Sequence, residues 1–238
     1  MGQGIQQAPV EQGGGSSAFL DVFKVLFDPI PVFTRIKQKP SVLYPWLVIS
    51  LLVLVITILT RPYNDAAMAA MRASLPPEQA ARMGGGGGAM RLVGVPIFTF
   101  VFAAIGAGLL WIGVALSATQ ARYKTLLSVL LHANMTYVLF AGITAVVLML
   151  RGVAAVTSMA DLRPPLGLDL LVPNASLYLG QVLNGINPFS AWGVWLCGTG
   201  IAITHGASKS TAIIVTAIVY VLALLIMSAP LLLVKVPA

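Results

Sequence analysis

Residues 211–234 read TAIIVTAIVYVLALLIMSAPLLLV, a stretch without a single charged side chain. An α-helix rises about 1.5 Å per residue, so a helix that crosses about 30 Å of hydrocarbon needs about 20 apolar residues. This stretch is long enough. It therefore predicts a transmembrane helix near the carboxyl end of the chain.

Four more uncharged apolar stretches precede it, at residues 44–60, 92–116, 126–150 and 189–204. The first and last of these are short for a crossing, but their amphipathic flanks complete the required length. Uninterrupted apolar runs predict helices, because strands of membrane barrels alternate apolar and polar residues over about 10 positions. We therefore expect an all-α integral membrane protein, a bundle of five transmembrane helices.

The composition agrees with this class of protein. Hydrophobic residues make up 58% of the sequence and charged residues 9%, whereas soluble domains carry about 25% charged residues. The net charge is +7, but the 14 basic residues are scattered among the loops and no aromatic side chains interleave with them. We therefore expect membrane lipids as partners, and no nucleic acid.

The residues before the first crossing divide into two parts. Residues 1–17 are rich in Gln and Gly and are expected to form a disordered tail. Residues 18–39 are amphipathic: apolar side chains recur at helical spacing on one face, and charged side chains fall on the other. The apolar set is Phe19, Leu20, Phe23, Leu26, Phe27 and Ile30, and the charged set is Asp21, Lys24 and Asp28. This pattern predicts a helix over roughly 18–28 that lies in the membrane interface, packs on the bundle, or does both.

Several helix boundaries follow from single residues. Pro29 and Pro31 are expected to end or kink the amphipathic helix before the five-helix domain of residues 40–238. Ser210 is expected to cap the last helix, and Pro230 to kink it near its end.

Two long segments separate the crossings. Residues 61–91 are expected to form a polar loop that is partly helical over 65–82 and flexible at the glycine run 84–88. Residues 151–188 contain a short amphipathic stretch at 175–186, in which Gln181 and Asn184 are expected to face water while apolar neighbours rest on the interface.

The strongest polar group inside a predicted crossing is His132, with Asn134 and Thr136 nearby. His132 and Thr136 are four residues apart and share a helix face. They could form a ligand, metal or proton site, or they could fix helix packing through interhelical hydrogen bonds. We favour the packing role, because only Cys197 among the other crossings could add a metal ligand.

Other side chains have expected structural roles. Small residues four apart let helices approach closely, and we expect this of Ala104 and Gly108, Gly113 and Ser117, and Gly198 and Ala202. Aromatic residues anchor proteins at the membrane interface, and we expect this of Phe19, Phe23, Phe27, Trp46, Trp192 and Trp195.

Basic residues near helix ends favour the cytoplasmic side. Five crossings place seven basic residues on each side, so the count alone does not decide the orientation. The cluster Arg35, Lys37 and Lys39 precedes the first crossing, and Arg122 and Lys124 lie in a short loop. Because the first helix and short loops weigh most, we expect a cytoplasmic N-terminus and a C-terminus outside.

The sequence offers little reaction chemistry. All seven acidic residues lie outside the five crossings, whereas ion-coupled carriers usually hold a charge within them. No Ser, His and Asp can be assembled at a common depth, so we expect no enzyme activity, no cofactor and no metal.

Three features together resemble the Yip domain family, named for Ypt/Rab GTPase-interacting proteins. They are the lead-in from Phe27-Asp28-Pro29 to Lys39-Pro40, the five-crossing layout with a long loop after the first crossing, and a carboxyl-terminal block. That block comprises Leu183 to Trp192, Gly198 to Ala202, a short loop with Lys209, and the last helix. The resemblance spans about residues 19–234.

Eukaryotic members of that family act in vesicle trafficking and bind Rab GTPases through cytosolic N-terminal regions. This chain has a short tail without an acidic-aromatic tract, so it looks like a prokaryotic member of the inner (plasma) membrane. The resemblance implies a non-enzymatic scaffold or accessory subunit that forms a homo-oligomer or binds other membrane proteins. The alternative is a small-molecule or lipid transporter with a polar site near His132.

Overall fold

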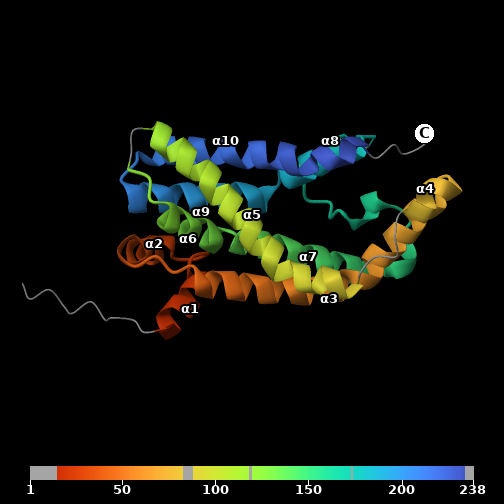
Figure 1. Ribbon diagram of the computed structural model, residues 1–238, viewed down its shortest axis with the longest axis horizontal. Coiled ribbons are helices and arrows are strands. Elements are labelled where there is room, and N and C mark those ends of the chain that lie inside the picture. Colours follow the sequence, from red (N-terminus) through yellow and green to blue (C-terminus); the bar gives the residue numbers. More distant parts are fainter. Residues whose placement is uncertain (1–14, 83–87, 118–119, 173, 234–238) are drawn as a thin grey trace, which may run out of the picture.

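Long helices that run roughly along one axis make up most of the molecule (Figure 1). The computed structural model describes residues 15–82, 88–117, 120–172 and 174–233, and every regular element in these ranges is helical. The α-helices are α1 (Gly15–Lys24), α2 (Pro29–Gln38), α3 (Leu43–Ala73), α4 (Pro77–Arg82), α5 (Gly88–Leu116), α6 (Tyr123–Ala133), α7 (Met135–Arg151), α8 (Leu177–Gly185), α9 (Pro188–His205) and α10 (Lys209–Ser228). Short 3-10 helices are η1 (Val153–Ala155), η2 (Met159–Leu162), η3 (Leu168–Leu171) and η4 (Ala229–Leu233).

Four helices in the described part of the chain are long and apolar enough to cross a membrane, judged by length and composition. They cover Leu43–Ala73, Leu92–Leu116, Tyr123–Arg151 and Lys209–Leu232. These spans confirm a multi-pass helical membrane protein. The expected crossing at 189–204 is the helix α9, which is not among the four.

The helix α9 lies inside the bundle. It packs against α2, α6, α7 and α10, and its buried residues include Leu196, Cys197, Thr199 and Ile201. A helix that other helices cover does not need an apolar face toward lipid. This position accounts for the glycines and threonines at the buried positions of α9.

The helix α3 continues beyond the expected end of the first crossing. The helix over 65–73, where Ala66, Ala67, Ala69 and Ala70 favour helix, agrees with the expected partly helical region, whereas the prediction of a loop is wrong over 61–64. Pro62 lies within the helix and gives up one backbone hydrogen bond there. The helix α4 also lies within the expected helical region 65–82, and positions 84–87 of the glycine run lie outside the described residues.

The amphipathic segment forms two helices, because Pro29 starts α2 instead of ending α1. The buried side chains of the segment are Val22, Val25, Leu26, Val32, Phe33 and Ile36. The expected apolar face splits, since Leu26 is buried whereas Phe19, Phe23 and Phe27 are exposed. Asp21, expected on the polar face, is buried. The tail residues 1–14 lie outside the described residues.

The third crossing is interrupted at one residue. Asn134 separates α6 from α7, yet the backbone N–H of Asn134 still donates to the carbonyl of Leu130 at 2.9 Å. The last crossing changes to the 3-10 helix η4 at Ala229, next to Pro230, as expected. Its cap differs from the expectation: Ser208, not Ser210, accepts the Thr211 N–H at 3.1 Å.

Candidate functional site

The expected polar site lies where α6 meets α7. His132 is 1% exposed, and its Nδ1 lies 2.7 Å from the carbonyl oxygen of Ser128. A carbonyl only accepts, so Nδ1 carries the proton and donates it. The Ser128 hydroxyl in turn donates to the Ser41 carbonyl at 2.6 Å, which joins α6 to the residues before α3. His132 is thus bonded within its own helix.

Thr136 and Asn134 are held by the same junction. Thr136 is buried, and its hydroxyl donates to the Ala133 carbonyl at 3.0 Å. It also lies close to α9, since a Cβ on Gly193 would stand 2.6 Å from the Thr136 hydroxyl oxygen. Asn134 is half-buried and provides backbone caps for both helices. The hydrogen bonds seen for His132 and Thr136 are therefore local along the chain: that of His132 lies within α6, and that of Thr136 spans the α6–α7 junction.

Two cavities in the described part of the chain bear on a ligand site. One of about 250 Å³ lies between α3 and α7, and one of about 150 Å³ involves Arg163 and Gln181. Neither is lined by His132, Asn134 or Thr136. Among the described residues, no three His, Cys, Asp or Glu side chains come together in a way that would hold a metal ion.

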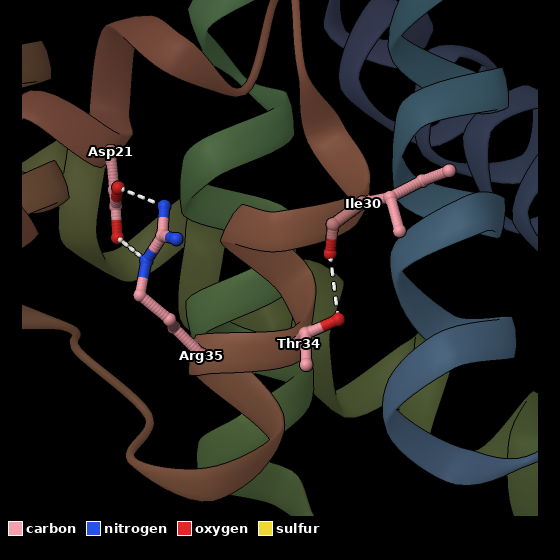
Figure 2. Close-up of polar contacts among 4 residues, drawn as sticks. All are labelled: Asp21, Ile30, Thr34 and Arg35. Atoms are coloured by element: carbon pink, nitrogen blue, oxygen red, sulfur yellow. Dashed lines mark hydrogen bonds and ion pairs between the residues drawn. The ribbon is translucent and has the colours of Figure 1, made fainter. Parts of the chain in front are cut away.

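An ion pair joins α1 to α2, the two helices that precede the first span (Figure 2). The Arg35 guanidinium is bidentate: Nε donates to Asp21 Oδ2 at 2.9 Å, and the second nitrogen donates to Oδ1. The side-chain hydrogen bond with Asp21 raises the pKa of Arg35 above its usual value and outweighs the opposing effect of partial burial. Because Asp21 is paired, its burial is tolerated.

The aromatic side chains of this segment that are expected at the membrane interface are exposed on α1 and on the turn between α1 and α2. Phe19 and Phe23 contact each other edge to face with ring centroids 5.8 Å apart, and Phe27 is 86% exposed. The buried face of the two helices meets the bundle, and these three aromatic side chains lie outside that face. An interface role for Phe19, Phe23 and Phe27 stays a prediction.

The three tryptophans occupy different surroundings. Trp46 is half-buried and donates from Nε1 to the Pro96 carbonyl at 3.0 Å, which ties α3 to α5. Trp192 packs against the core, whereas Trp195 is exposed with Lys209 Nζ 5.3 Å from its ring centroid. Trp46 and Trp192 thus have contacts within the bundle in addition to any anchoring role.

The small residues on α9 and α5 differ in what they face. A Cβ on Gly198 would stand 2.8 Å from Ile213 Cα, and one on Gly113 would stand 2.6 Å from Val215 Cγ1, both on α10. A Cβ on Gly108 would meet nothing within 4 Å. Ala202 packs against the core, Ser117 donates to the Val114 carbonyl at 2.7 Å, and the Ala104 carbonyl accepts from Tyr123 at 2.9 Å.

Sequence reasoning missed a buried polar network at the opposite end of the bundle. Asn184, expected to face water, is buried and donates from Nδ2 to the Pro164 carbonyl and to Asp169 Oδ1, both at 3.2 Å. Asn187 caps α9 and donates to the Asn184 carbonyl at 2.9 Å. Tyr220 of α10 donates to the Gly185 carbonyl at 2.7 Å. The network fixes the turn from α8 into α9 against the preceding loop.

These observations define a class of protein, a multi-pass helical membrane protein with an N-terminal helix pair tied to the end of its bundle. The Yip1 domain family matches residues 23–229, and the chain belongs to this family. The match confirms the resemblance seen in the lead-in and in the carboxyl-terminal block. No curated protein and no solved structure matches the chain.

Proposed function

We propose that this Yip1-domain protein is a non-enzymatic scaffold or accessory subunit of a membrane complex, with five crossings. The observation that carries the proposal is the outer face of α5. Its large side chains Phe98, Ile105 and Ile112 are exposed, and the open position at Gly108 leaves room for a second helix. Small residues support close helix contacts in lipid, where the hydrophobic effect gives no drive for association.

The polar residues within the crossings support the same function. Thr57, Thr60 and Thr144 each donate to the carbonyl one turn earlier in their own helix, at 2.7 to 2.8 Å. His132 does the same. Such groups add little cost in lipid and are not held ready for reaction. We therefore propose packing roles for His132, Asn134 and Thr136.

Purification in a mild detergent tests the scaffold proposal. We expect the tagged protein to elute as a homo-oligomer or with a stable membrane partner. Replacing Gly108 with Leu should fill the open position on α5 and reduce that association. Gly142→Leu is the matched control, because a Cβ at Gly142 also meets nothing within 4 Å but lies on α7. Recovery of the wild type only as a monodisperse monomer would contradict the proposal.

Transport of a small molecule or lipid is the second candidate. The cavity of about 250 Å³ favours it, because Thr57, Thr60, Asn64, Tyr137 and Thr144 supply polar groups to its wall. Tyr137→Phe and Thr60→Val should then impair uptake of a substrate into vesicles, whereas His132→Leu should not. Equal uptake in all three variants would leave this candidate without support.

We also propose that the protein lies in the inner membrane of a prokaryote, with its N-terminus in the cytoplasm. The Arg122 N–H donates to His205 Nε2 at 3.2 Å, so the α5–α6 loop lies beside the α9–α10 turn. The contact of Ser128 with Ser41 brings the N-terminal segment to the same end. Basic residues at this end are Lys24, Arg35, Lys37, Lys39, Arg122, Lys124 and Lys209, against Asp21 and Asp28. Arg35, Lys37 and Lys39 precede the first span and Arg122 and Lys124 lie in a short loop, which are the positions that weigh most, so they favour the cytoplasmic side for this end.

A further inference from the structure

A cavity of about 150 Å³ lies at the end of the bundle opposite α1 and α2. Four segments meet there: the end of α3, the loop with η2, the helix α8 and the 3-10 helix η4 beside it (Figure 1). The residues that line the cavity are Met71, Met159, Arg163, Leu177, Gln181 and Leu231. Met71 and Leu231 lie near the carboxyl ends of the candidate spans Leu43–Ala73 and Lys209–Leu232. We therefore place the cavity at the level of a bilayer surface.

Arg163 is a cation on this wall without a counter-charge in the described chain. The two ion pairs found among the described residues are Arg35 with Asp21 and Arg61 with Asp65. The nearest carboxylate in sequence, Asp161, accepts from the backbone N–H groups of Thr157 and Ser158 at 2.9 and 2.8 Å. Burial alone would raise the pKa of Asp161. These hydrogen bonds and those from the Thr157 and Ser158 hydroxyls outweigh that effect, so the pKa of Asp161 lies below its usual value.

The second carboxylate of the loop is also occupied. Asp169 Oδ1 accepts from Asn184 Nδ2 at 3.2 Å as part of the buried network. Both acidic groups of the loop therefore accept hydrogen bonds from uncharged groups, and neither forms an ion pair with Arg163. Arg163 keeps its positive charge available on the cavity wall.

The helix α8 makes room for this guanidinium at one residue. A Cβ on Gly180 would overlap Arg163 Nη1, so the absence of a side chain there lets Arg163 lie across the helix. Gln181 follows directly and brings an amide to the same wall. The remaining side chains of the wall are apolar, namely two methionines and two leucines.

We propose that this cavity binds the acidic headgroup of an amphiphile, a carboxylate or phosphate monoester that carries an alkyl chain. The guanidinium matches the geometry of such oxyanions and binds them through paired hydrogen bonds. Methionine and leucine side chains suit the first methylene groups of the chain, and the rest of the chain extends into the bilayer. A cavity of about 150 Å³ holds a molecule the size of benzene, so it takes the headgroup region and not a whole lipid.

Thermal unfolding of the full-length protein in a neutral detergent tests the proposal. The probes are dodecanoate, dodecyl phosphate, dodecanol and inorganic phosphate. We expect at least one acidic amphiphile to raise the unfolding temperature in a saturable way, and the comparison of the two distinguishes carboxylate from phosphate. Dodecanol and inorganic phosphate should have little effect, because each lacks one half of the recognised group.

Variants separate the site from general charge effects. Arg163→Gln should weaken binding about 10-fold or more, as expected when a charged hydrogen bond is lost. Arg151→Gln, which removes an exposed arginine from the end of α7, should bind like the wild type. Gly180→Ala keeps the charge but displaces the guanidinium, so it should also weaken binding and serves if Arg163→Gln does not fold.

Three results would overturn the proposal. They are equal binding by Arg163→Gln and the wild type, an equal loss in Arg151→Gln, and stabilisation by dodecanol or inorganic phosphate as strong as by the acidic amphiphiles.

Discussion

The helices α5 and α9 belong to one bundle, yet they differ in what covers them. The exposed face of α5 carries large apolar side chains such as Phe98 and Ile105, as a helix that meets lipid requires. The helix α9 is surrounded by α2, α6, α7 and α10, and it holds glycine and threonine at buried positions. Apolar composition therefore reports contact with lipid. The helix α9, which other helices enclose, is not among the four candidate spans that length and composition identify in the described part of the chain.

The largest expected difference is between a phenylalanine that packs against α9 and a phenylalanine on the exposed face of α5. Phe33 of α2 is 0% exposed and would meet a Cβ on Gly200 of α9, whereas Phe98 of α5 is 58% exposed. Phe33→Ala should lower the free energy of unfolding by about 3 kcal/mol, because it leaves a cavity against α9. Phe98→Ala should change it little. Unfolding of both variants in the same detergent measures the difference, and equal losses would mean that α9 is no better covered than α5.

Two glycines give the next largest difference. Gly198→Ala places a Cβ 2.8 Å from Ile213 Cα, a backbone atom that cannot rotate away. We expect a loss of about 1–3 kcal/mol from this overpacking. Gly108→Ala meets open space and should be neutral or should stabilise α5 by about 0.5–1 kcal/mol through helix propensity. Thermal unfolding ranks the two variants, and a reversed ranking would break the comparison.

Two threonines should give a smaller difference of opposite sign. The buried hydroxyl of Thr199 on α9 has no hydrogen-bond partner among the described residues. Thr199→Val should therefore stabilise the protein by about 1 kcal/mol, because the cost of an unpaired buried group is removed. On α5, Thr99 donates to the Val95 carbonyl at 2.8 Å, so Thr99→Val should have little effect. A loss of stability in Thr199→Val would contradict this, because it would mean that the Thr199 hydroxyl does form a hydrogen bond.

The smallest effect is expected at His132, on the helix α6 that packs against both α5 and α9. His132→Leu retains much of the volume and removes the hydrogen bond to Ser128. The loss should be at most about 1 kcal/mol, the usual net contribution of one intramolecular hydrogen bond. Unaltered unfolding together with loss of a co-purified partner would instead assign His132 a functional role.

Much of the bundle could be predicted from local sequence, because long uncharged apolar runs identify helices that face lipid. The dipeptide Asn187-Pro188 is typical of a helix start, and Asn187 caps α9. The continuity of α3 through 61–64 was not predicted, because the helix continues past Pro62 and joins the apolar run to the alanine-rich region that was expected to be partly helical.

Buried polar residues depend on partners that are distant in sequence. Asp21 is buried because Arg35 lies 14 residues further on, and Asn184 because the loop places Pro164 and Asp169 against it. Amphipathic spacing alone placed both side chains in water. The sequence likewise located His132, but only the structure shows that its hydrogen bond stays within α6.

The account rests on α9 as a true crossing, and labelling of single cysteines tests this most directly. Ser74, Gln120 and Ser210 are exposed, so cysteines at these positions can react with a reagent in water. Thr125, close to Gln120 in the sequence, is buried and is therefore not used. Each is replaced in a Cys197→Ala background and treated from outside the cell with a membrane-impermeant thiol reagent. We predict that position 74 reacts, and that positions 120 and 210 react only after permeabilisation. Labelling of 210 together with 74, while 120 stays protected, would show that α9 does not cross and would contradict the five-helix account.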